Sequence, residues 1–137
     1  MNDKQFAEVK ERCSKLITEW ATKLGLTWYK IDVDYKMGDA PKSYTGTGIA
    51  PLNCKVAWQY RTALITIYIE EIPEEDDLLE HAIVHELCHI FVNPMRVCDE
   101  HFDMDREEYT VEMLTRAFLW LKDTKAEKSP PSEESNG

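Results

Sequence analysis

The chain lacks several features that define large protein classes. No stretch approaches the ~18 apolar residues that a membrane span requires, and the N-terminus has no basic start followed by an apolar segment, as a secretory signal would. The 4 cysteines are scattered without a Cys-x-x-Cys pair, so no zinc ribbon or thioredoxin-type motif is available. We therefore expect reduced thiols, a cytoplasmic location and no membrane partner.

Positive charge is also scarce. The chain has 16 Lys and Arg against 26 Asp and Glu, a formal net charge of −10. Proteins that read nucleic acids usually carry a basic stripe, so no nucleic-acid partner is expected. The length and a hydrophobic content of 43% suffice for a single domain with a core, which we place at residues 1–122. Residues 123–137 are rich in Lys, Glu, Ser and Pro and are predicted to be a disordered acidic tail.

Apolar periodicity predicts an α+β domain. Steps of three and four residues indicate helices, and strict alternation indicates strands. Gly25 and the pair Asn93-Pro94 are expected to end helices. The predicted helices are 3–24, 76–92 and 105–122, and the predicted strands are 27–36, 55–60 and 63–70, the last two forming a hairpin at Arg61-Thr62.

The segment 37–53 contains glycines and prolines and is predicted to be an irregular connection. Gly46 and Gly48 do not make a phosphate loop, because no third glycine or following Lys-Ser/Thr is present. This connection, or the tail at residues 123–137, could cover a binding cleft if one lies beside it.

One segment, His85-Glu86-Leu87-Cys88-His89, indicates a chemistry. Histidines at i and i+4 lie on one helical face and can hold one Zn²⁺, while the glutamate between them can serve as a general base. A chance match on an ordinary core helix is the plainer reading. The surrounding apolar sequence argues against it, because buried histidines and a glutamate need partners that a metal would supply. Cys88 faces away from both histidines and is predicted to be a packing residue.

A catalytic zinc needs a third protein ligand, and several candidates follow. They are three glutamates of the last helix, Glu107, Glu108 and Glu112, and His101 in the polar connection.

The order of elements resembles a zincin metallopeptidase, in particular the minimal gluzincins and the small candidate metallopeptidases of bacteria and phages. In that plan a His-Glu-x-x-His helix is followed by a helix that carries an acidic third ligand, and a carboxylate four residues later often orients a ligand histidine. The resemblance therefore implies Glu108 as the third ligand and Glu112 as the orienting carboxylate, with Glu107 and Glu112 still open as alternative ligands. A metzincin is excluded, since Val92 and Met95 occupy its glycine and histidine positions. A SprT-like protein, with His101 as third ligand, is the second choice.

The resemblance implies a zincin-like fold: an N-terminal helix, a mostly antiparallel sheet of three to four strands, the motif helix and a glutamate-bearing helix. It implies a Zn²⁺-dependent peptidase in which Glu86 acts as general base on a peptide or protein substrate, with a monomer as the expected state. Strand 63–70 is expected to be the sheet edge that binds extended substrate. His101 and Tyr109 are candidates for the stabiliser of the transition state, and His81 for lining the cleft. The alternative is a metal-binding zincin-fold regulatory module without proteolytic activity.

Overall fold

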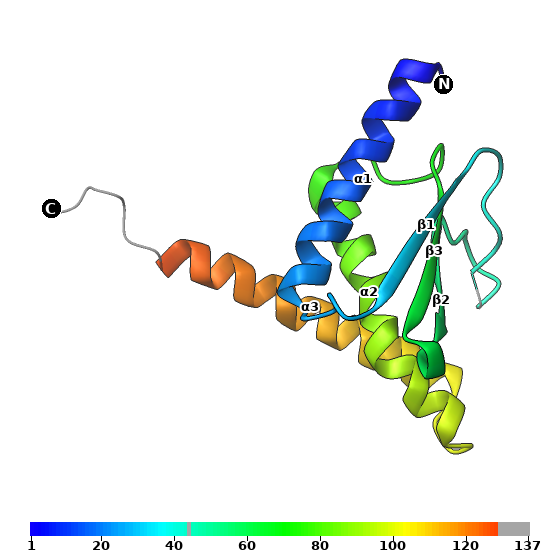
Figure 1. The fold of residues 1–137 in the computed structure, drawn as a ribbon, viewed down its shortest axis with the longest axis vertical. Helices are drawn as coiled ribbons and strands as arrows, with labels where there is room; N and C mark the ends of the chain where they lie inside the picture. Colours follow the sequence, from blue (N-terminus) through cyan, green and yellow to red (C-terminus); the bar gives the residue numbers. More distant parts are fainter. Residues whose placement is uncertain (44, 129–137) are drawn as a thin grey trace, which may run out of the picture.

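Three helices and a three-stranded sheet make up the described chain (Figure 1). The structure is a computed structural model and describes residues 1–43 and 45–128. The predicted α+β domain is confirmed. The elements in chain order are α1 (Asp3–Lys23), β1 (Lys30–Lys36), β2 (Leu52–Ala57), the 3₁₀ turn η1 (Trp58–Tyr60), β3 (Thr62–Tyr68), α2 (Asp76–Cys98) and α3 (Met104–Lys128).

Helix α1 begins and ends on local signals. Asn2 and Gln5 form a reciprocal capping box at the N-terminus, which satisfies two backbone N–H groups that the helix leaves free. The helix ends before Gly25, whose φ of 73° suits a residue without Cβ. Cys13, Ile17 and Trp20 form its buried face, and α1 and α2 cover the same side of the sheet (Figure 1).

The sheet is mixed and has the order β1-β3-β2. β1 runs parallel to β3, whereas β2 runs antiparallel to it, so the sheet is not mostly antiparallel as expected. β3 is central because its apolar residues Ala63, Ile65 and Ile67 are buried. The expectation that strand 63–70 is an exposed edge is therefore wrong. The edge that packs beside α2 is β2.

The predicted hairpin is confirmed, with different bounds. Residues 58–60 form the 3₁₀ turn η1 instead of continuing the strand. Arg61 closes the turn in the left-handed conformation, with φ of 54°, which explains how the chain reverses without a glycine.

Helix α2 does not end at Asn93-Pro94 as predicted. It continues to Cys98 with Pro94 inside it, although an interior proline typically costs about 3 kcal/mol. An ion pair between Arg96 of α2 and the buried Glu107 of α3 ties this last part of the helix to its neighbour. That tertiary contact favours continuation where the local sequence favours a stop.

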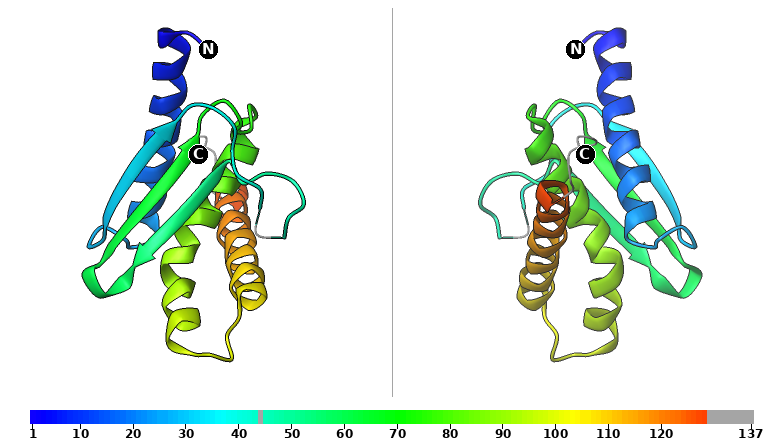
Figure 2. Two further views of the ribbon diagram at one scale, coloured as in Figure 1. Left: turned by 90° about the vertical axis from the view of Figure 1, so that its right-hand side faces the viewer. Right: turned by 90° about the vertical axis from the view of Figure 1, so that its left-hand side faces the viewer.

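Helix α3 runs antiparallel beside α2 (Figure 2). It was expected to end at Lys122 but continues to Lys128, so residues 123–128 belong to the helix and not to a tail. This extension contains Ala, Glu and Lys, which are good helix formers. The rest of the predicted tail, 129–137, lies outside the described residues. No helix within the described chain is both long and apolar enough to cross a membrane.

Glu80 connects the three helices. The residue is 8% exposed, and its carboxylate accepts a hydrogen bond of 2.7 Å from Trp20 Nε1 of α1 and bonds of 2.8 Å from Lys122 Nζ of α3. Glu80 has no capping role, since Glu75 is the N-cap of α2 and no side-chain hydrogen bond caps this helix. Burial of this charge is tolerable because both oxygens are paired.

Candidate metal centre

Helices α2 and α3 bring two histidines and a glutamate together. His85 and His89 lie one turn apart on α2, and Glu108 projects from the first turns of α3. Glu108 Oε1 lies 3.1 Å from His85 Nε2, and Glu108 Oε2 lies 2.9 Å from His89 Nε2. One potential ligand atom from each residue lies within 4.8 Å of the other two. Of the described residues, these three alone form such a group.

The other ring nitrogen of each histidine also contacts a carboxylate. His85 Nδ1 lies 3.1 Å from Glu112 Oε1, and His89 Nδ1 lies 2.6 Å from Glu107 Oε2. Such contacts fix the tautomer and the ring plane, leaving both Nε2 atoms directed at Glu108. The two outer carboxylates are themselves held, Glu107 by Arg96 and Glu112 by His81 and Arg116.

Contacts within the cluster and burial shift the pKa values of its side chains. Hydrogen bonding to His85 and His89 lowers the pKa of Glu108 to about 2. Burial lowers the pKa of His85, but the hydrogen bond to Glu108 and the charge of Glu86 outweigh it and raise the pKa to about 9. The pKa of His89 is raised in the same way, by Glu108, Glu86 and Glu107 against burial. Without a metal the two imidazoles therefore favour the protonated form.

Glu86 differs from the other carboxylates in having no partner. It makes no hydrogen bond or ion pair with another described residue, although His85, His89 and Glu108 lie around the same cavity. Burial raises the pKa of Glu86 to about 7, with the two histidines opposing this rise. A carboxylate with a pKa near neutrality can both take and return a proton.

The cluster faces a cavity of about 230 Å³. Strand β2 forms one wall with Leu52, Asn53 and Cys54, and α2 forms another with the motif and with Asn93 and Arg96. Met104 and Glu107 of α3 and Ser43 and Ala50 of the 37–51 connection complete the described lining. Burial raises the pKa of Cys54, which favours the thiol over the thiolate in the metal-free protein.

The remaining sequence candidates lie elsewhere. The side chain of His101 is 85% exposed in the connection between α2 and α3, and its ring pairs with Glu100. Tyr109 is 67% exposed, and neither residue lines the cavity. His81 contacts Glu112 and not the triad. Cys88 is fully buried, as predicted for a packing residue.

Two residues of the site have roles that the sequence did not predict. Glu107 was considered as a metal ligand, but its contact with His89 Nδ1, on the far side of the ring from Glu108, was not expected. Arg96 was not considered, because it follows Pro94, where α2 was expected to have ended. The spacing from His89 to Arg96, two helical turns, was the available signal.

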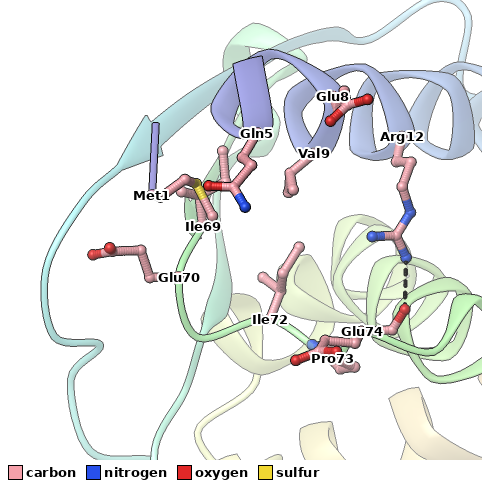
Figure 3. Close-up of a pocket in the computed structure, with 10 residues that line it drawn as sticks. All are labelled: Met1, Gln5, Glu8, Val9, Arg12, Ile69, Glu70, Ile72, Pro73 and Glu74. Carbon is pink, nitrogen blue, oxygen red and sulfur yellow. Dashed lines mark hydrogen bonds between the residues drawn. The ribbon is translucent and has the colours of Figure 1, made fainter. Parts of the chain in front are cut away.

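A larger groove lies at the N-terminal end of α1 (Figure 3). Its volume is about 750 Å³, and Val9, Ile69 and Ile72 supply apolar walls. Arg12 Nη2 donates to the Glu74 carbonyl at 3.2 Å in this groove and to Asp76 at 2.7 Å. No histidine or cysteine is among its described lining residues.

The donor set fits zinc. Two imidazole nitrogens and one carboxylate are the ligands of many catalytic zinc sites, which keep a further position open. With metal–ligand bonds of 2.0–2.2 Å, ligand atoms in a tetrahedral site lie about 3.3 Å apart. One candidate ligand atom from each of the three residues lies within 4.8 Å of the other two, which is close enough for a shared ion after side-chain adjustment.

Comparison of the chain with protein-family models, with curated proteins and with solved structures gave no match. The resemblance to zincins therefore rests on the motif, the order of elements and the geometry of the site.

Proposed function

We propose that the protein is a zinc-dependent peptidase in which His85, His89 and Glu108 hold the metal. The observation that carries the proposal is the convergence of both Nε2 atoms on Glu108, with Glu112 and Glu107 behind the two rings. A bound Zn²⁺ would polarise a peptide carbonyl and lower the pKa of a coordinated water to about 7.

Glu86 is the general base of this proposal. Its carboxylate, which has no partner among the described residues, borders the same cavity as the triad, and burial raises its pKa to about 7. It would take a proton from the attacking water and pass it to the leaving amine. Substitution by glutamine keeps its shape but removes this ability.

Strand β2 is the proposed docking edge for extended substrate. It pairs with β3 on one side, and its residues Leu52, Asn53 and Cys54 line the cavity. A peptide could add to the other side by main-chain hydrogen bonds, which confer affinity with little sequence preference. This assigns to β2 the role that strand 63–70 was expected to have.

The test compares Glu86→Gln with the wild-type chain. We expect one Zn²⁺ per chain in both, measured by elemental analysis, and a rate of cleavage of a mixed peptide library that falls by about 10²- to 10⁴-fold in the variant. Glu8→Gln, the same change in the larger groove, should cleave like the wild type. Chelation should abolish cleavage, and added Zn²⁺ should restore it.

Two outcomes would contradict the proposal. If Glu86→Gln and the wild type cleave equally, the assigned base is wrong. If the wild type binds stoichiometric zinc and cleaves no peptide, the chain is a metal-binding module of the alternative class.

A further inference from the structure

The cavity beside the triad contains a cation that the mechanism above does not use. Asn93 and Arg96 follow His89 by four and seven residues, which places all three on one side of α2. Both line the cavity. Arg96 is the sole lysine or arginine among the described lining residues, although five described lining positions are histidine or glutamate.

The guanidinium of Arg96 retains donors for a ligand. Its Nε donates to Glu107, and no bond from its Nη1 or Nη2 is found within the described chain. The side chain is 33% exposed. Two terminal nitrogens of a planar guanidinium can bind a carboxylate through two parallel hydrogen bonds, which a lysine cannot match.

Arg96 is also close to the proposed metal. Glu107 bridges the two, since one oxygen contacts His89 Nδ1 and the other accepts from Arg96. A single carboxylate thus separates the guanidinium from a ligand ring. An extended peptide advances about 3.3–3.6 Å per residue, so a group bound to Arg96 would lie within one or two residues of a bond held at the metal.

We propose that Arg96, with Asn93 beside it, binds a carboxylate of the substrate. The preferred substrates are then peptides with a carboxylate one or two residues from the cleaved bond, either the C-terminus or an Asp or Glu side chain. This inference rests on the proposed peptidase function for the position of that bond.

For binding of a carboxylate in this cavity, the local charge of Arg96 matters more than the net charge of the chain. The formal charge of −10 repels acidic peptides at a distance, but salt at physiological strength screens charges beyond about 8 Å. Inside a small cavity a charge-assisted pair is screened far less. An acidic protein can therefore select an acidic ligand at one point.

The test measures binding and not cleavage. Zinc-loaded Glu86→Gln protein is titrated by calorimetry with two pairs of peptides. One pair differs in a C-terminal carboxylate or carboxamide, and the other, amidated at the end, carries Glu or Gln near the centre. We expect at least about tenfold tighter binding of the carboxylate form in one pair, which identifies the source of the group. Equal binding within both pairs overturns the inference.

Two further variants in this background locate the preference. Arg96→Gln should bring both forms to nearly equal affinity. Because Arg96 also holds Glu107, Asn93→Asp serves as a second, nearly isosteric variant that leaves that pair intact and places a competing carboxylate beside Arg96. It should reduce the preference by a similar factor, whereas Gln59→Glu, the same charge change outside the cavity, should not alter it. A preference that persists in Asn93→Asp, or in a folded Arg96→Gln, overturns the inference.

The design separates this inference from the proposed function. A chain that binds zinc and cleaves peptides, yet shows no carboxylate preference, contradicts only the role of Arg96. If the wild type binds no zinc, the peptidase proposal fails by itself. The peptide series on metal-free protein, with the same variants, then still tests whether Arg96 binds carboxylates.

Discussion

Two hollows of the described chain, the groove beside α1 and the cavity beside α2, differ in size and in chemistry, and the larger one has fewer candidate ligand atoms. The groove beside α1 has a volume of about 750 Å³, and its arginine already bonds to Asp76 and Glu74. The cavity beside α2 has about 230 Å³ but contains three convergent candidate ligand atoms and a carboxylate, that of Glu86, with no partner among the described residues. Volume alone would favour the first hollow. The convergent side chains favour the second as the candidate site.

Removal of the third ligand should give the largest difference in zinc affinity between variants of the small cavity and variants of the larger groove. Glu108→Ala leaves two histidines without their common partner, and we expect zinc affinity to fall by more than about 100-fold, beyond the usual effect of an outer residue. Competition with a chromophoric chelator measures this. Glu70→Ala in the larger groove and His101→Ala should bind zinc like the wild type. Loss of zinc in His101→Ala with retention in Glu108→Ala would move the chain to the SprT-like plan.

The outer carboxylates should have a smaller effect. Glu112→Gln weakens the hold on His85 Nδ1, and we expect zinc affinity to fall by about 10- to 100-fold. The same chelator competition applies, with the fold checked by circular dichroism. Glu100→Gln removes an equal charge from an 88% exposed side chain and is the matched control. Equal affinity in the two variants would show that Glu112 has no part in orienting the ring.

Protons should compete with the metal at the small cavity. The pKa of His85 in the metal-free protein, about 9, lies above its usual value of about 6.5. The protonated ring therefore stabilises the metal-free fold fully below pH 6.5, and this contribution is lost as the pH rises through 9. Zinc needs the neutral ring, so its affinity should rise about tenfold per pH unit between pH 6.5 and 8.5 for each proton released. Titrations at three pH values measure this, and a flat profile would contradict the assignment.

We expect the smallest effect from a substitution in the larger groove. Arg12 and Asp76 pair at 2.7 Å with side-chain exposures of 36% and 85%, and exposed pairs contribute about 0–1 kcal/mol. Arg12→Gln should therefore lower the free energy of unfolding by at most about 1 kcal/mol in urea titrations, with zinc affinity unchanged. A large loss of zinc binding in this variant would mean that the two hollows are coupled.

The sequence pattern predicted those parts of the fold that depend on residues close together in the chain. The alternation of Ile31, Val33 and Tyr35 marks a half-buried strand, and the structure has β1 there. The spacing of His85 and His89 places them on one face, and the i+4 relation of Glu108 and Glu112 places these carboxylates one turn apart. Each relation depends only on residues that are close in sequence.

Apart from the end of α3, the main failures involve contacts between distant segments. Local sequence cannot show that β3 pairs on both sides, because the pairing of β1 with β3 depends on how α1 and α2 pack. The continuation of α2 past Pro94 depends on the contact of Arg96 with Glu107. A tertiary contact of this kind overrides a local helix stop.

The ties at Arg96–Glu107 and Lys122–Glu80 have one more consequence. They clamp the antiparallel pair of helices at two separate levels, with the histidines and their carboxylates between them. A slip of α3 by one turn, about 5.4 Å, would break both clamps at once. These two contacts therefore favour a single register of α3 against α2 in the metal-free protein. The proposed metal would then need little ordering of the chain to bind, and more of its intrinsic binding energy would remain as affinity.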